Sequence, residues 1–178
     1  MTALIPMRQA EFASFFEMVV NSYAADNVAA GRWPADEALS LSRAETERLL
    51  PQGLATPDNY LYEVLDGAGG NTVGHIWFAA MARGSMKVAF VYQVQVKPEF
   101  RRQGHARAAL KATESIAIAK GFSGIALHVF GHNEGAQSLY ASLGYRVAGV
   151  NMFKPFSKMA SNRSLNRTAH GVPPRAAG

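Results

Sequence analysis

The chain has 178 residues and contains no cysteine. Disulfide bonds and a cysteine nucleophile are therefore excluded, and a cytoplasmic location is expected. No apolar run approaches the ~20 residues that cross a bilayer, and the first residues lack the basic and apolar segments of a signal peptide. These absences predict one globular domain of ordinary size in the cytoplasm, without a membrane partner.

Acidic residues are missing from the last part of the sequence. Residues 154–178 hold five Lys or Arg residues and no acid, which leaves 13 basic and 13 acidic residues in 1–153. The net charge of +5 therefore belongs to the tail, and a solvated tail is favoured over one that contacts nucleic acid or an anionic surface. We expect a domain over residues 1–156 and a disordered basic tail over 157–178. No nucleic-acid partner is expected, and a homodimer stays open.

The two best-known phosphate-binding loops are also absent. No glycine is followed by Lys-Ser or Lys-Thr, and residues 101–106 contain one glycine where a dinucleotide fingerprint has three. Residues 94–107 instead read as the end of a strand, a turn at Pro98 and an Arg- and Gly-containing loop that opens a helix. The free backbone N–H groups of a helix start attract anions. The small Gly104 lets a ligand approach the backbone, so the segment predicts an anion cradle for a pyrophosphate.

Hydrophobic periodicity predicts strands and helices along the whole chain. Strands are expected at 2–6, 60–65, 72–81, 87–96, 125–130 and 145–153, and helices at about 8–30, 36–50, 104–120 and 134–143. The Gly-rich link 66–71 joins two strands and is therefore a hairpin loop. Trp33, in the loop between the first two helices, is open to two interpretations: a cover for the core or part of a substrate pocket.

Two motifs in this order resemble a known family. Arg101-x-x-Gly104-x-Ala106 is similar to the coenzyme A signature of the GNAT N-acetyltransferase superfamily. Residues 133–145 read Asn-x-x-Ala-x-x-Leu-Tyr-x-x-x-Gly-Tyr and resemble the family's later motif, with Tyr145 in place of the usual Phe. A helix and a strand separate the two motifs, as in that family. The resemblance covers residues 60–156 firmly and the first two helices more loosely.

The resemblance implies an α/β (α+β) fold, in which a central mixed sheet has helices on both faces and its two central strands splay apart. It also implies acetyl-CoA as the co-substrate and no metal. The pantetheine arm would lie in the splay along Val94 and Val96, and the pyrophosphate would lie on the N–H groups of 102–107. The residues expected to bind acetyl-CoA are Val94, Gln95, Val96, Arg101, Arg102, Gln103, Gly104, His105, Ala106, Arg107, Asn133, Ala136 and Tyr140. For Asn133, a role as a helix cap is the alternative.

The expected reaction is direct transfer of an acetyl group to a primary amine, without a covalent intermediate. The N–H of Val96 would polarise the thioester carbonyl, and Tyr140 would protonate the departing thiolate, with simple packing as its alternative role. The base stays open between Glu63, His128 and a water relay, since Tyr92 and Gln93 are poor bases. A non-catalytic acyl-CoA sensor of the same fold is the alternative function. The acceptor amine and the acyl-chain preference are not predicted.

Overall fold

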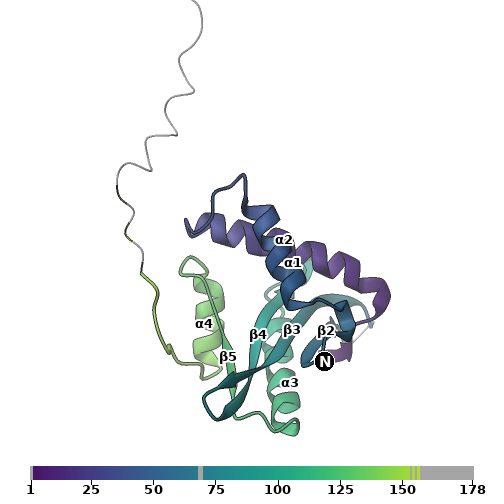
Figure 1. Ribbon diagram of the computed structural model, residues 1–178. Helices are drawn as coiled ribbons and strands as arrows, with labels where there is room; N and C mark the ends of the chain where they lie inside the picture. Colours follow the sequence, from purple (N-terminus) through teal and green to yellow (C-terminus); the bar gives the residue numbers. More distant parts are fainter. Residues whose placement is uncertain (1, 68–69, 153, 155, 157–178) are drawn as a thin grey trace, which may run out of the picture. The chain divides into compact units, whose positions relative to one another are not determined.

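The computed structural model describes residues 2–67, 70–152, 154 and 156. The chain divides after Tyr145 into a first unit, residues 1–145, and a second, residues 146–178. All the helices and strands described below belong to the first unit (Figure 1). The predicted tail, 157–178, lies outside the described residues, and the predicted domain boundary stays a prediction.

Two long helices follow the first strand. Helix α1 spans Gln9–Ala29 and helix α2 spans Ala38–Leu49. Gly31, with φ +69°, adopts a left-handed conformation just after α1 and helps to end it. The buried hydroxyl of Ser42 donates to the Val20 carbonyl at 2.7 Å and ties the two helices together. None of the helices in the described ranges is long and apolar enough to cross a membrane.

Five strands form one sheet in the order β1-β2-β3-β4-β5. Successive strands are antiparallel, except that β4 and β5 are parallel. Their bounds are β1 Ala3–Pro6, β2 Asn59–Leu65, β3 Thr72–Arg83, β4 Met86–Val96 and β5 Ile125–Leu127. A crossover helix joins β4 to β5, as a parallel pair requires.

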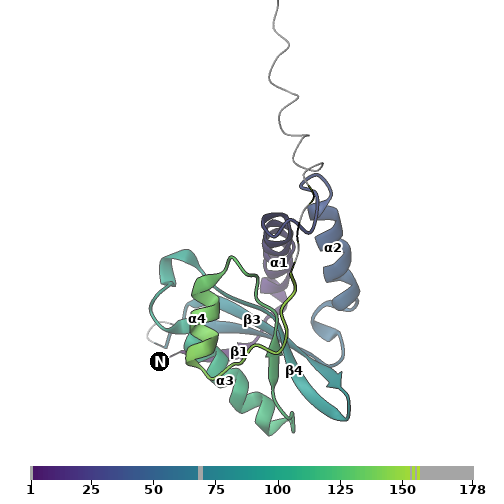
Figure 2. The same ribbon diagram turned by 90° about the vertical axis from the view of Figure 1, so that its left-hand side faces the viewer.

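Helices cover both faces of this sheet, as Figures 1 and 2 show together. On one face α1 packs through Phe15 and Val19 against Leu61 and Trp77. On the other face α3, His105–Ala119, buries Ala109, Leu110 and Ala117 against the strands. Helix α4, Glu134–Ser142, contributes Leu139 and Tyr140 to the same cluster as α3. This arrangement confirms the fold class expected from the sequence.

The parallel strands β4 and β5 separate after a short contact. Their ladder runs only from Ala89 to Val91 on β4. Next to it the register with β3 shifts, so that Tyr92 is an extra residue, a β-bulge that bends its strand. The predicted strand 125–130 is therefore too long: it ends at Leu127, where β4 moves away and no longer supplies a partner. The expected separation of these two strands is observed, but β5 is the edge strand of the sheet that the described residues form, so only β4 is central.

The predicted strand 145–153 is wrong over the residues that can be described. Residues 146–152 form neither helix nor strand. Gly149 and Asn151 alternate with apolar residues here, and both are poor strand formers, so alternation alone overstated the tendency to form a strand.

Candidate active site

A cleft of about 1150 Å³ opens where β4 and β5 separate. It has two halves, which we name after the helices beside them. The α3 half is formed by the end of β4, residues 100–107 and residues 133–142. The α1 half is formed by side chains from α1, α2, β3 and β4, with residues 127–130 between the two. Among the lining residues are Ser22, Tyr23, Asp26, Arg32, Glu45, Trp77, Phe90, Tyr92, Gln93, Val94, Gln95, Val96, Arg101, Arg102, Gly104, His105, Ala106, Arg107, His128, Phe130, Asn133, Ala136 and Tyr140.

The end of β4 directs backbone groups into the α3 half. The N–H of Lys97 donates to the Val73 carbonyl at 2.8 Å, one residue past the Val96–Gly74 pair. Because bonding direction alternates along an antiparallel ladder, Gln95 also faces β3, while Val94 and Val96 present N–H and C=O toward the side that β5 has left. The Val96 carbonyl accepts a hydrogen bond from Arg101 Nε at 3.1 Å on that side. The N–H groups of Val94 and Val96 therefore face the cleft.

The start of α3 adds further N–H groups. Gly104 is its N-cap, with φ +87°, and no side chain caps this helix end. A Cβ built on Gly104 would meet no atom within 4 Å. Glycine is thus needed for the left-handed backbone rather than to avoid a neighbour, and the space beside it is open. The first-turn N–H groups at 105–107 have no partner within the helix and suit an anion.

Three arginines surround this helix start. Arg101 is held on the Val96 carbonyl, and Arg107 donates from Nη2 to the Ser142 hydroxyl at 2.7 Å, which links α3 to α4. Arg102 lies two residues before the N-cap Gly104 and has a positive φ of 62°. In the described part of the chain none of the three forms an ion pair. Their positive charge is left for a ligand.

Three expected residues have side chains engaged elsewhere or too small to bond. Gln103 Nε2 donates to the Glu99 carbonyl at 3.2 Å. His105 Nδ1 lies 3.0 Å from the Thr2 hydroxyl and its ring packs edge-on against Phe100. Ala106 has only a methyl group. These residues can serve an anion only through their backbone N–H groups.

Helix α4 brings the second motif to the same cleft. Asn133 is its N-cap: the side-chain Oδ1 accepts the Ala136 N–H at 3.1 Å. Asn133 therefore acts as a helix cap, and its hydrogen bond uses the N–H group of Ala136. Tyr140 lies two turns further, half-buried, with its ring 5.6 Å from that of Tyr145. Burial raises the pKa of the Tyr140 phenol, so it stays protonated at neutral pH.

Aromatic side chains dominate the α1 half. Trp77 is buried, stacks on Tyr92 at a centroid distance of 4.6 Å and donates from Nε1 to Asn59. Phe90 packs edge-on against Tyr92, with a centroid distance of 4.9 Å. Trp33 does not line the cleft but packs edge-on against Tyr23, which does. Trp33 thus supports the pocket wall from behind.

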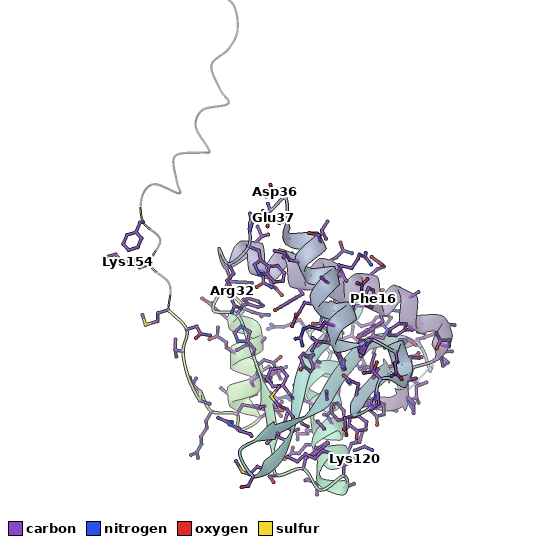
Figure 3. The ribbon with its side chains drawn as sticks, viewed as in Figure 1. Phe16, Arg32, Asp36, Glu37, Lys120 and Lys154 are labelled. Atoms are coloured by element: carbon purple, nitrogen blue, oxygen red, sulfur yellow. The ribbon has the colours of Figure 1, made fainter. Side chains whose placement is uncertain are left out.

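Charged side chains connect α1 with the segment that follows β5. Asp26 Oδ1 lies 3.0 Å from His132 Nε2. The Arg32 guanidinium lies over the Phe130 ring at 5.8 Å, and Figure 3 shows Arg32 beside the start of α4. Glu45 on α2 is paired with Arg48 at 2.6 Å. The α1 half therefore combines aromatic surface with carboxylates at its edge.

The candidate bases differ sharply in their surroundings. Glu63 is completely buried, not solvent-facing, and forms a bidentate ion pair with Arg8. The Arg8 hydrogen bond overcomes the effect of burial and lowers the pKa of Glu63 to about 2, so it is not a base near neutral pH. His128 is exposed at the cleft, and partial burial and the charge of Arg32 lower its pKa. Gln93 Nε2 is held by the Ser22 hydroxyl at 3.3 Å.

Several lining residues carry no signal in the sequence. Asp26, Arg32, Glu45 and Phe90 come from separate elements and belong to no motif. Tyr23 lies on the apolar face of α1 at helical spacing from Phe15 and Val19, and nothing in that spacing distinguishes a core residue from a pocket residue. His75 on β3 is not a lining residue; it too belongs to no motif and alternates like any other strand residue. Only the folded sheet brings these side chains together.

Comparison with known proteins agrees with this architecture. The sequence model of the Acetyltransferase (GNAT) family matches residues 24–145. Two relatives from Bacillus subtilis (strain 168), YycN and YdgE, are named uncharacterized N-acetyltransferases. YycN is 34% identical over 151 residues, which is 85% of this chain and 96% of YycN. YdgE is 32% identical over 148 residues, which is 83% of this chain and 94% of YdgE.

Solved structures give the same result. The crystal structure of YycN superposes with a TM-score of 0.83 at 33% identity, covering 88% of this chain and 99% of the other. A GCN5-related N-acetyltransferase from Ralstonia eutropha JMP134 has a TM-score of 0.64 at 21% identity, covering 88% and 99%, and supports the fold alone. With its two motifs, splayed sheet and family match, this chain belongs to the GNAT family of acetyltransferases.

Proposed function

We propose that the protein transfers an acetyl group from acetyl-CoA directly to a primary amine. The observation that carries this proposal is the α3 half of the cleft. There, the outward N–H groups of Val94 and Val96, the uncapped start of α3 and Tyr140 all border the same cleft. One extended ligand with an anionic end and a thioester end fits these groups.

The anionic end of acetyl-CoA binds at the start of α3. The N–H groups of residues 102–107 and the charges of Arg101, Arg102 and Arg107 neutralise the pyrophosphate without a metal ion. The pantetheine arm adds to the open edge of β4 as an extra strand would, through Val94 and Val96. Gln95 faces away from this arm and contributes no backbone bond to it.

The chemical step needs a polarised carbonyl, a neutral amine and a protonated leaving group. The Val96 N–H polarises the thioester carbonyl. The amine enters from the α1 half, where aromatic rings hold its body, and its nitrogen forms the new C–N bond as the C–S bond breaks. Tyr140 gives its proton to the departing thiolate. The amine proton then restores the phenol.

A panel of amines tests this proposal directly. The protein is incubated with acetyl-CoA and small aliphatic, aromatic and peptide amines, and release of free thiol is followed together with the mass of the acetylated product. We expect thiol release that depends on one class of amine. Tight acetyl-CoA binding by calorimetry without transfer to any amine would contradict an enzyme and support the acyl-CoA sensor.

A further inference from the structure

A row of polar side chains crosses the sheet beneath α1. Glu63 on β2, His75 on β3 and Gln95 on β4 are directly opposite one another in the strand register. Side chains paired in this way share a face of the sheet, with Cβ atoms about 5 Å apart. The Phe15 ring of α1 packs edge-on against His75 at 5.7 Å, which identifies the face as that of the α1 half.

Two atoms of this row have no hydrogen-bond partner among the described residues. They are Nε2 of His75 and Oε1 of Gln95, and both are buried. Gln93, two residues before Gln95 on the same face, is by contrast held by Ser22. A buried polar atom without a partner is costly, so such atoms usually meet a ligand or an ordered water. Gln95 lines the cleft and lies between Val94 and Val96.

We propose that His75 is the proton acceptor for the incoming amine, reached through a water molecule that Gln95 Oε1 holds at the floor of the cleft. The inference rests on the proposed function. An ammonium ion, R–NH3⁺, gives one proton through the water to His75 Nε2 and becomes R–NH2. That amine forms the C–N bond, and the thiolate takes the Tyr140 proton. The remaining amine proton restores Tyr140, and His75 releases its proton to solvent.

The surroundings of His75 suit this role. Burial, and next the charge of Lys97 after β4, lower its pKa, so the imidazole is neutral near pH 7 and can accept a proton. Glu63 on β2 and Glu11 on α1 act in the opposite direction and favour the imidazolium once it forms. Arg8, at the start of α1, is paired with Glu63, and its positive charge reduces the stabilisation that Glu63 gives to the imidazolium. The other candidates are less suitable, because Glu63 is held ionised and His128 is exposed.

Two probe amines separate a base from a structural residue. Benzylamine is protonated at neutral pH and needs a base, whereas aniline is already neutral. Both match the aromatic lining of the α1 half. His75→Gln should lower kcat/KM for benzylamine by about 10²-fold, the usual size of a general-base contribution, and for aniline by no more than a few-fold. The acid limb set by His75 should disappear from the benzylamine pH profile, and kcat/KM should instead rise with pH up to the pKa of the free amine. Gln95→Leu should show the same difference between amines.

His128→Gln is the matched comparison, since His128 lines the cleft and is the other histidine considered as a base. It should keep the acid limb. Loss of the limb in His128→Gln, or equal losses for both amines in His75→Gln, would overturn the inference. Nuclear magnetic resonance titration of the wild-type imidazoles gives an answer even where a variant fails to fold: His75 must titrate at the pH of the limb, and a His75 that does not is not the base. Failure of all acetyl transfer would instead contradict the proposed function.

Discussion

The α3 half of the cleft presents backbone, whereas the α1 half presents side chains. In the α3 half, the N–H groups of Val94, Val96 and the first turn of α3 face the opening. They come from two segments that are close in the sequence, the end of β4 and the start of α3. In the α1 half, Tyr23, Trp77 and Tyr92 come from three different elements. In the proposed function the backbone surface would bind acetyl-CoA, which is the same whichever amine accepts the acetyl group. A side-chain surface can change residue by residue, so it is where the choice of amine would be made.

The largest expected effect concerns Tyr140, the side chain of the α3 half for which we propose a chemical role. Tyr140→Phe keeps the ring that packs near Tyr145 and removes only the proton donor. We expect kcat to fall by roughly 10²-fold or more, with acetyl-CoA affinity within a few-fold of wild type. Single-turnover kinetics and calorimetry measure the two quantities. An unchanged chemical step would make Tyr140 a packing residue, and a lost affinity with normal kcat would make it a contact for CoA.

The next effect is on stability and concerns the end of the polar row beneath the α1 half. The carboxylate of Glu63 is buried while that of Glu17, paired with Arg43 at 2.7 Å, is half exposed. Arg8→Ala should therefore lower the free energy of unfolding more than the loss of an exposed ion pair does, because it leaves a buried charge without its partner. Arg43→Ala, the matched control, should lower the free energy of unfolding only slightly, because both charges of its pair stay in contact with solvent. Denaturant unfolding measures both.

The pH dependence of the same pair has a definite sign. The pKa of Glu63 is about 2 in the folded protein and about 4.3 in an unfolded chain. Its contribution to stability is therefore complete above the unfolded value and is lost as the pH falls toward 2. The difference in free energy of unfolding between wild type and Arg8→Ala should become smaller over that pH range. A difference that stays constant down to pH 2 would show that packing, and not charge, is what Arg8 supplies.

A smaller effect is expected from the backbone of the α3 half. Gly104→Ala places a methyl group in the open space beside the helix start, and we expect acetyl-CoA affinity to fall about tenfold. Because Gly104 has φ +87°, the substitution also strains the backbone. Gly121 is the matched control, since it has φ +75°, lies at the other end of α3 and has similarly open space. Gly121→Ala should lower the melting temperature comparably but leave calorimetric affinity unchanged, and equal affinity losses would mean that strain alone is responsible.

The contrast between the halves also explains what the sequence could predict. The strand, turn and helix around Gly104 are continuous in the chain, so their geometry follows from local rules and the α3 half could be anticipated. The surroundings of Glu63 could not be predicted. Alternation along the strand indicates only that Glu63 and Tyr62 point to opposite faces, and it does not reveal Arg8, 55 residues away, as the partner of Glu63. The early end of β5 at Leu127 likewise depends on the bulge at Tyr92 in another strand. Pairings between distant segments have no local signal.

The smallest expected effect tests whether the α1 half acts on the amine alone. Asp26 lines the cleft, and its pair with His132 is half exposed, so it contributes little to stability. Asp26→Asn keeps the size of the side chain and removes its negative charge, which should weaken attraction for a protonated amine. We expect KM for benzylamine to rise about threefold. Added salt should also raise KM in the wild type, because it screens the same attraction between charges. Acetyl-CoA affinity by calorimetry should not change, because no part of the α3 half is altered. A fall in acetyl-CoA affinity, with KM for benzylamine unchanged, would show that the two halves do not divide donor and acceptor between them.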